Sequence, residues 1–179
     1  MTAPRAAYPV IETERLILRA PDARDLDAWM AFFMGPRSHY IRSVDQVEEL
    51  GWRAFASVCG HWTLRGYGQF VFAAKDAPDA TLGAAGPWNP AGWPETEIGW
   101  TVWADHAEGK GYAREAAEAG RAYAYDTLGW TTAVSYIDAR NARSVRLAER
   151  LGATPDWDAA TPRGEQCVVF RHPAPEALQ

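Results

Sequence analysis

A glycine-containing loop between an extended segment and a helical one restricts the fold of this sequence more than any other feature. Residues 97–103 (EIGWTVW) are rich in β-branched and aromatic residues, which favours a strand. Gly109-Lys110-Gly111 follows, and residues 112–128 then carry alanines and Gly120 on one helical face. Because small side chains let a helix lie close to a sheet, this segment predicts a strand followed by a helix packed against it.

The remaining sequence adds strands and helices on both sides of this unit. Hydrophobic spacing predicts two earlier helices, one capped by Asp22 and ending at Gly35, the other capped by Ser43 with Gln46 and ending near Gly66. The same criterion predicts a helix over 141–151 and strands at 16–18, 69–74, 81–85, 132–137 and 166–171.

Glycines and prolines mark two places where the extended pattern is interrupted. Residues 86–94 (GPWNPAGWP) hold three prolines and two glycines, so we expect neither a helix nor a central strand there. Gly99 lies inside the strand predicted at 97–103. A glycine inside a strand indicates a bulge or a close approach of backbone or ligand.

This order of elements predicts the fold class. Helices alternate with strands only in the second half of the chain, so we expect an α/β (α+β) protein with a mixed sheet. The predicted organisation is an N-terminal arm over 1–12, a single domain over 13–173 and a C-terminal tail over 174–179. A chain of 179 residues that is 47% hydrophobic can build one core without disulfides.

Composition excludes several classes of protein. The net charge of −5 argues against nucleic acid as a partner. Cys59 and Cys167 are isolated, which disfavours a disulfide scaffold and a zinc module, and we expect no metal. The sequence shows neither a signal-peptide pattern nor a membrane-spanning stretch, so we expect a cytoplasmic protein with no membrane partner.

The loop at 109–111 is of a kind that binds phosphate. Glycines at the start of a helix leave backbone N–H groups bare, and the positive end of the helix dipole adds to their attraction. A Walker loop would need Ser or Thr where Gly111 stands, and the dinucleotide fingerprint would need glycine where Arg114 stands, so both are excluded. The loop alone is equally compatible with a plain turn and helix cap.

The context of the loop resembles the GNAT superfamily of N-acetyltransferases, within it the branch like the ribosomal-protein N-acetyltransferases. The pyrophosphate motif of that superfamily, Gln/Arg-x-x-Gly-x-Gly/Ala, reads here as residues 106–111 (HAEGKG), with His106 departing from the usual Gln or Arg. Residues 97–100 (EIGW) look like the fourth strand of the family, and residues 141–153 (NARSVRLAERLGA) are similar to its Asn-x-x-Ser helix. The resemblance covers roughly residues 12–172.

The resemblance implies a fold and a cofactor. The fold is a mixed, strongly twisted central sheet of about six to seven strands flanked by about four helices. In the family, the fourth and fifth strands splay at a bulge, and the pantetheine arm of acetyl-CoA pairs with the backbone there. Carried over to this chain, the cofactor-binding residues are Thr101, Val102, Trp103, His106, Gly109, Lys110, Gly111, Tyr112, Ala113, Arg114 and Asn141.

The resemblance also implies the reaction, which is direct transfer of an acetyl group from acetyl-CoA to an amine. By analogy Ser144 is the general acid for the departing thiolate, and we nominate Glu97 as the base. Each has an alternative interpretation from the residues alone. Ser144 could satisfy a helix carbonyl, Asn141 could cap its helix, and Glu97 could pair with an arginine.

The tryptophans fall into two groups. Trp29 and Trp62, with Phe33 and Phe55, have helical spacing and are predicted to be core. Trp88 and Trp93 lie in the loop before the strand at 97–103 and are candidates to bind the acceptor. The arginines of the last helical region are expected to form a solvated face, from which the first two could reach the 3′-phosphate of CoA: Arg140, Arg143, Arg146 and Arg150.

Function thus has two predicted forms. The first is an acetyl-CoA-dependent N-acetyltransferase whose acceptor is a protein N-terminus or a small-molecule amine. The alternative is a catalytically idle acyl-CoA-binding domain that serves as a sensor or an assembly part. The partners of the enzyme would be acetyl-CoA and an amine acceptor. A monomer and a homodimer are equally compatible with the sequence.

Overall fold

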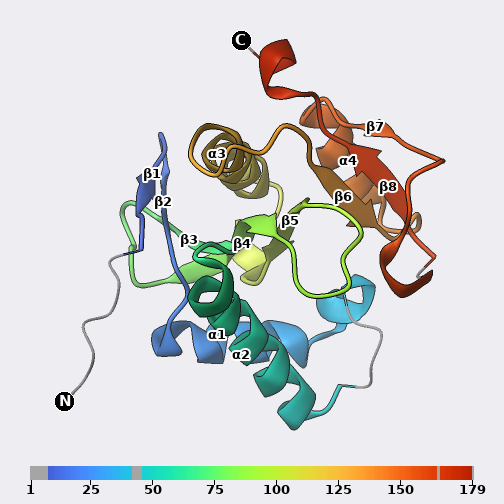
Figure 1. Cartoon of the computed structure of the whole chain (residues 1–179). Coiled ribbons are helices and arrows are strands. Elements are labelled where there is room, and N and C mark those ends of the chain that lie inside the picture. The colour runs from blue at the N-terminus through green and yellow to red at the C-terminus, as the bar shows by residue number, and fades with distance from the viewer. Residues whose placement is uncertain (1–7, 42–45, 165, 179) are drawn as a thin grey trace.

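The computed structural model of the chain describes residues 8–41, 46–164 and 166–178. Its centre is an open eight-stranded sheet with the strand order β1-β2-β3-β4-β5-β6-β8-β7 (Figure 1). Neighbouring strands are antiparallel except β5 and β6, which are parallel. The strands are β1 (Ile11–Glu12), β2 (Leu16–Arg19), β3 (Phe70–Ala74), β4 (Thr81–Trp88), β5 (Glu97–Val102), β6 (Val134–Ile137), β7 (Thr154–Pro155) and β8 (Val168–Arg171).

Four α-helices flank the sheet, as predicted: α1 (Leu26–Phe33), α2 (Glu48–Arg65), α3 (Tyr112–Asp126) and α4 (Ala142–Arg150). The mixed α/β class is confirmed. The sheet has eight strands, more than the six to seven expected, and the two that the sequence analysis did not predict are the two-residue strands β1 and β7. Five short 3-10 helices complete the described structure: η1 (Ala23–Asp25), η2 (Pro36–Tyr40), η3 (Asp105–Ala107), η4 (Pro162–Gly164) and η5 (Pro175–Leu178).

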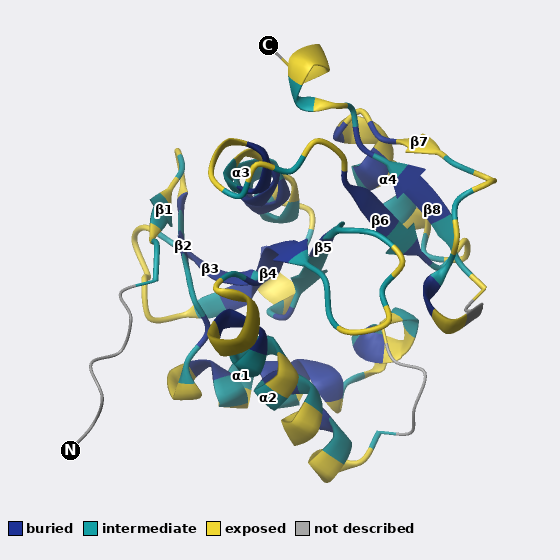
Figure 2. Ribbon diagram, in the orientation of Figure 1, coloured by how far each residue is buried: buried dark blue, intermediate teal, exposed yellow. Residues whose placement is uncertain are grey.

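The two faces of the sheet carry different helices. Trp103, directly after β5, and Val71 of β3 pack in one cluster with Trp29 of α1 and Phe55 of α2. Ile98 of β5 packs with the alanines of α3 in a second cluster. Since successive strand residues point to opposite faces, α1 and α2 cover one face and α3 covers the other (Figures 1 and 2).

Two sequence predictions need correction. Residues 86–88 do belong to a central strand, because Pro87 of β4 pairs with Ile98 of β5. Pairing between β3 and β4 ends at Ala85, so Pro87 lies beyond the end of β3. Because proline has no backbone N–H, this position is tolerated: there is no β3 residue opposite it to accept a hydrogen bond. Helix α2 begins at Glu48 with Val47 as an N-cap that makes no side-chain hydrogen bond, and Ser43 lies outside the described residues.

Gln46, predicted to complete the cap of α2, instead ties the start of that helix to the end of α1. Its side-chain amide donates to the carbonyl oxygens of Phe33 at 3.1 Å and Gly35 at 2.8 Å. The Phe33 carbonyl belongs to the last turn of α1, and Gly35 lies just beyond that helix, where its carbonyl also accepts from the Ser38 backbone N–H at 3.4 Å. Gln46 therefore satisfies a helix C-terminus.

The small-residue face of α3 has the effect predicted from the sequence. A Cβ added at Gly120 would lie 2.6 Å from the Cα of Gly86 in β4, so only glycine allows this approach of helix to strand. The contact sets the depth at which α3, and with it the 109–111 loop, sits on the sheet.

Gly120→Ala is expected to lower the free energy of unfolding by about 1–3 kcal/mol, because the clash involves backbone that cannot rotate away. Gly60→Ala is the matched control: Gly60 is in α2, and an added Cβ there meets nothing within 4 Å. This control should raise stability by about 0.5–1 kcal/mol through helix propensity. Urea unfolding followed by tryptophan fluorescence measures both, and equal changes in the two variants would contradict the close approach.

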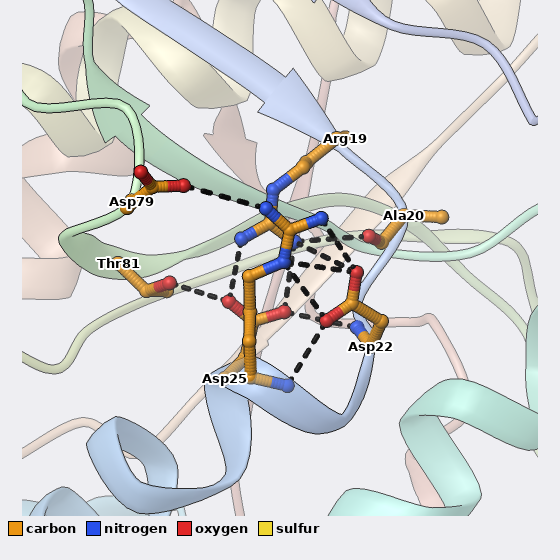
Figure 3. Close-up of polar contacts among 7 residues, drawn as sticks. Arg19, Ala20, Asp22, Asp25, Asp79 and Thr81 are labelled. Atoms are coloured by element: carbon orange, nitrogen blue, oxygen red, sulfur yellow. Dashed lines mark hydrogen bonds and ion pairs between the residues drawn. The ribbon is translucent and has the colours of Figure 1, made fainter.

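A buried ion pair fastens the N-terminal segment to the sheet (Figure 3). Asp25 is fully buried and accepts two hydrogen bonds from Arg19 of β2, each 2.8 Å long. It also accepts from the Asp22 backbone N–H at 2.9 Å and from the Thr81 hydroxyl of β4. The helix cap predicted at Asp22 is on η1, which runs into α1, and the N-cap of α1 itself is Asp25, which also joins η1, β2 and β4.

Candidate functional site

The site begins where β5 and β6 part. These parallel strands pair at one register position, Glu97 with Val134, and then diverge (Figure 1). A pocket of about 580 Å³ lies at this divergence and is lined by residues of both strands. The register between β4 and β5 is continuous from Gly83–Val102 to Trp88–Glu97, so the strands separate without the β5 bulge that the family pattern implied.

The pocket passes from one face of the sheet to the other. Glu97, Gly99 and Thr101 share the face of β5 covered by α1 and α2, whereas Ile98 and Trp100 lie on the opposite face. All five residues line the pocket. A ligand entering on the α4 side can therefore meet a second ligand entering on the α1 and α2 side.

The pocket collects seven of the residues predicted from the sequence: Trp88, Trp93, Glu97, Thr101, Trp103, Asn141 and Ser144. The other predicted residues, Val102 and those of the loop at 106–114, are not in its lining. The loop residues lie where η3 leads into the first turn of α3. His106 is exposed there.

Glu97 lies at the pocket end that faces α1 and α2. Its carboxylate accepts a hydrogen bond of 2.6 Å from the indole N–H of Trp93. A Cβ added at Gly99 would collide with the amide nitrogen of Gln69 and lie 3.6 Å from Glu97 Oε1. A side chain at position 99 would thus displace the Gln69 amide, which agrees with the close approach that the sequence predicted, and Gln69 and Glu97 converge above Gly99.

Ser144 and Asn141 lie at the other end, at the start of α4. The Asn141 side chain accepts from the Ser144 backbone N–H at 3.2 Å, so Asn141 is the N-cap of this helix. The Ser144 hydroxyl accepts a hydrogen bond of 3.3 Å from the indole N–H of Trp100. Within the described residues, the Ser144 hydroxyl is hydrogen-bonded to the indole and not to a helix carbonyl.

The loop before α3 is preformed for an anion. Gly109 and Gly111 have φ values of 74° and 80°, a region that favours glycine, and Gly111 is an N-cap that makes no side-chain hydrogen bond. The first N–H groups of α3 are therefore left without a cap. Arg15 donates to the Lys110 carbonyl at 2.9 Å and pairs with Glu115, which supports the loop from β2.

Glu115 stays ionised in this support. Burial by itself would raise the pKa of its carboxyl, but hydrogen bonds from Thr13 and Arg15 outweigh burial, and the pKa is lowered. Arg15 also lies over the Tyr112 ring, 4.9 Å from its centroid. The charge pair thus holds the first turn of α3 against β2.

Arg37, which the sequence analysis did not single out, lies at the end of β5. It donates to the Val102 carbonyl at 3.0 Å and to the Trp103 carbonyl, and it pairs with Asp105 at 2.6 Å and Glu108 at 3.0 Å. No sequence pattern could reveal it, because the Val102 carbonyl is 65 positions away along the chain. Arg37 connects η2 to β5 and to the residues that precede Gly109.

Only some backbone groups of β5 point into the space between the diverging strands β5 and β6. Trp103 N–H donates to the Leu82 carbonyl at 2.7 Å, towards β4, whereas the Ile98 carbonyl accepts from Ser135 of β6. Because backbone groups alternate in direction along a strand, those of Trp100 and Val102 face the divergence.

Arginines of α4 and the turn before it already have partners. Arg140 holds Asp138 through two side-chain hydrogen bonds of 3.0 and 2.6 Å, which lower the pKa of that carboxyl to about 2. Arg143 pairs with Glu108. Both arginines are exposed, as predicted for a solvated face.

Tyr136 of β6 lines the pocket and was missed by the sequence analysis. Burial raises the pKa of its phenol to about 12, so the hydroxyl remains protonated at neutral pH. Its oxygen accepts from the Glu95 backbone N–H at 3.2 Å. Nothing in its sequence position distinguishes Tyr136 from other residues of a strand.

A buried network fixes the place where β5 and β6 separate. The Ser135 hydroxyl donates to the Ile98 carbonyl at 2.6 Å and lies 2.9 Å from Nε2 of His172, whose Nδ1 is 3.2 Å from Arg121. Because the arginine can only donate, Nδ1 accepts and the proton of neutral His172 is on Nε2. The network therefore joins α3, the residue directly after β8, β6 and β5.

This network makes stability depend on pH. Burial, followed by the charge of Arg121, lowers the pKa of His172 to about 3. Unfolding restores an ordinary histidine of pKa about 6.5, so the unfolded state binds one more proton between these values. Stability is therefore lost as pH falls below about 6.5, by up to about 1.4 kcal/mol per pH unit from this group.

His172→Gln should remove that dependence while costing stability at pH 8. We expect the difference in unfolding free energy between wild type and variant to shrink as pH falls from 7 to 4, measured by urea unfolding at each pH. Parallel curves for the two proteins would contradict a neutral buried His172.

In residues 8–41, 46–164 and 166–178, no group of three or more His, Cys, Asp or Glu side chains is placed to hold a metal ion. Among the helices of the same residues, none is both long and apolar enough to cross a membrane.

Comparisons with known proteins agree with this architecture. The family model described as an acetyltransferase (GNAT) domain matches residues 15–154. A crystal structure of an acetyltransferase from Agrobacterium tumefaciens is 32% identical, with a TM-score of 0.84, covering 97% of this chain and 99% of that one. A comparison with curated protein sequences found no match.

Two more distant structures share the fold. A putative ribosomal-protein-serine acetyltransferase from Vibrio cholerae is 19% identical with a TM-score of 0.72, covering 93% of this chain and 99% of that one. A spermidine N-acetyltransferase from Vibrio cholerae, in complex with CoA and spermine, is 18% identical with a TM-score of 0.67, covering 89% and 94%. With most of its domain matched by the family model, the chain belongs to the GNAT acetyltransferase family.

Proposed function

We propose that this protein is an acetyl-CoA-dependent N-acetyltransferase that transfers the acetyl group directly to a primary amine. The observation that carries the proposal is the pocket between β5 and β6, which has Glu97 at one end and Ser144 at the other. Membership of the GNAT family supports acyl transfer. The two ends of the pocket suit two substrates that meet at the separation of the strands.

The residues present fit a CoA-type cofactor. The glycine conformations at 109 and 111 and the uncapped first turn of α3, with Tyr112, Ala113 and Arg114, suit the pyrophosphate, with Lys110 beside it. The backbone N–H of Val102, between Thr101 and Trp103, suits a carbonyl of the pantetheine arm, whereas the Val102 carbonyl already accepts from Arg37. His106 is exposed and would contact the cofactor only from the protein surface. Asn141 lines the pocket, where the acetyl end of the cofactor would lie.

The chemistry requires one group to accept a proton and another to donate one. The amine arrives as an ammonium ion and gives a proton to Glu97, directly or through a water. Its nitrogen then bonds to the acetyl carbonyl carbon, the carbon–sulfur bond breaks, and Ser144 protonates the departing thiolate. The second proton lost by the nitrogen replaces the one that Ser144 gives, so the products are an amide and a free thiol.

Trp100 prepares Ser144 for this role. An indole N–H can only donate, so the Ser144 oxygen accepts from Trp100 and directs its own proton elsewhere. That proton is the one the thiolate needs. Trp93 has the corresponding position at Glu97, where its indole N–H donates to one carboxylate oxygen.

We also propose the class of the acceptor and the conditions in which the protein works. The acceptor is a protein N-terminus or a small-molecule amine, and the protein works in the cytoplasm as a monomer or homodimer without nucleic acid, membrane or metal.

Thermal shift with CoA, acetyl-CoA and ATP tests cofactor binding, and release of free thiol with a panel of amines tests turnover. We expect stabilisation by both CoA compounds and amine-dependent thiol release. Stabilisation by ATP but not by CoA would overturn the cofactor. Stabilisation by CoA without thiol release from any amine would indicate the alternative, an idle acyl-CoA-binding sensor or assembly domain.

A further inference from the structure

The pocket walls are unusually rich in aromatic rings. Five of the nine tryptophans of the chain line it: Trp29, Trp88, Trp93, Trp100 and Trp103. Tyr40 and Tyr136 line it as well. They come from α1, η2, the end of β4, the loop after it, β5 and β6, so the rings surround the cavity from several elements rather than forming one stripe.

The polar edges of four of these indoles are already used within the protein. The N–H groups of Trp93 and Trp100 donate to Glu97 and Ser144, and that of Trp103 donates to the Thr101 hydroxyl at 2.9 Å. The N–H of Trp29 donates to the Gly51 carbonyl at 2.8 Å. The rings therefore present apolar faces and edges to a ligand, and their hydrogen-bonding capacity stays with the protein.

Trp88 has a fixed position. Its ring stacks on His61, with centroids 4.5 Å apart and an interplanar angle of 23°. His61 is held in turn, because its Nε2 accepts from the Asn89 backbone N–H at 3.1 Å and its Nδ1 lies 2.6 Å from the Tyr67 carbonyl. The half-buried Trp88 ring is thus a rigid wall, which lowers the entropy cost of stacking a ligand against it.

Two polar side chains of the lining lie close together at one end of the pocket. Gln69 and Glu97 converge above Gly99, beside the ring of Trp93. The second carboxylate of the lining, Asp138, is held by Arg140. A polyamine would need several carboxylates spaced along its length, whereas Glu97 and Asp138 are the two carboxylates of the described lining.

From this arrangement we infer that the acceptor is a small monoamine carried on a flat aromatic body, with its ring against Trp88 and its nitrogen directed to Glu97 and Gln69. The inference rests on the proposed acetyl transfer and narrows its acceptor. Aromatic pairs favour stacked or edge-to-face contacts, and an ammonium group is attracted to indole faces, so ring and nitrogen are both recognised. A volume of about 580 Å³ suits a molecule of this size.

The test compares 2-phenylethylamine with n-butylamine, spermidine and a short peptide with a free N-terminus, using thiol release. We expect kcat/KM for 2-phenylethylamine to exceed that for n-butylamine by about 10-fold or more. Thermal shift with each amine in the presence of CoA measures binding separately from turnover. Preferred turnover or binding of spermidine or the peptide would overturn the inference and leave the N-acetyltransferase proposal standing.

Variants connect the preference to the pocket wall. Trp88→Ala should raise KM for 2-phenylethylamine about tenfold with little change for n-butylamine, and Trp88→Phe should restore most of the loss. Trp157→Ala, at a site where the ring is 78% exposed, is the control and should change neither. Equal losses for both amines in Trp88→Ala would show a purely structural role and contradict the inference. Thiol release from none of the amines, with CoA still stabilising the protein, would refute the proposed function instead.

Discussion

Replacing Ser144 with alanine is expected to lower kcat for acetyl transfer by about 10²–10⁴-fold, the range typical of a lost general acid. The Ser144 oxygen accepts from the Trp100 indole, so its own proton is available to the departing thiolate. Alanine removes that proton and keeps the helix, since Asn141 caps α4 through the backbone N–H of residue 144. Thiol release under saturating acetyl-CoA measures the effect.

Two comparisons isolate the role of the hydroxyl. Ser57→Ala is the matched control, because Ser57 lies exposed on α2 and donates to the Arg53 carbonyl one turn earlier. Its activity should equal that of wild type. Affinity for CoA, measured by thermal shift, should change little in Ser144→Ala. A rate within a few-fold of wild type would discard Ser144 as the acid and leave the remaining site intact.

Replacing Asp25 with alanine is expected to lower the free energy of unfolding by about 3–5 kcal/mol. Asp25 is fully buried, and its carboxylate holds Arg19, the Asp22 N–H and the Thr81 hydroxyl together (Figure 3). Alanine would leave the largely buried guanidinium of Arg19 without this carboxylate, and that uncompensated charge is the main cost. Urea unfolding followed by tryptophan fluorescence gives the value.

Asp25→Asn and Asp79→Ala complete this experiment. Asparagine keeps the shape and part of the hydrogen bonding but loses the charge, so its loss should be smaller than that of alanine. Asp79 is exposed and lies 3.5 Å from Arg24, so its removal should change stability by about 0.5 kcal/mol or less. If Asp25→Ala costs no more than Asp79→Ala, the buried pair does not fasten η1 to the sheet.

Several elements of the fold were predictable because their determinants are local. The glycines at 66, 111 and 152 adopt positive φ and end or begin helices, and Asp22 caps η1. These effects act over one helical turn, so sequence spacing reveals them. The Ser43 cap shows the limit of such reasoning, since α2 begins at Glu48 and Gln46 bonds the end of α1 instead.

The candidate site was only partly predictable for the same reason. Its motif residues, among them Glu97, Asn141 and Ser144, are recognisable because they lie in short segments with family spacing. Gln69, Arg37 and Tyr136 belong to no such segment. They reach the site or the end of β5 only because separate strands and helices bring them there, as Arg37 does across 65 positions to Val102.

The sequence by itself determined the secondary structure in outline, the phosphate-type loop and the identity of the family, because these depend on residue types at short spacing. Only the tertiary structure decided that Pro87 belongs to a central strand, since that depends on where β3 ends. It also decided that β5 and β6 separate beyond Glu97 and that five tryptophans from distant segments surround the opening. Such arrangements come from packing between remote elements, which hydrophobic periodicity along one segment does not encode.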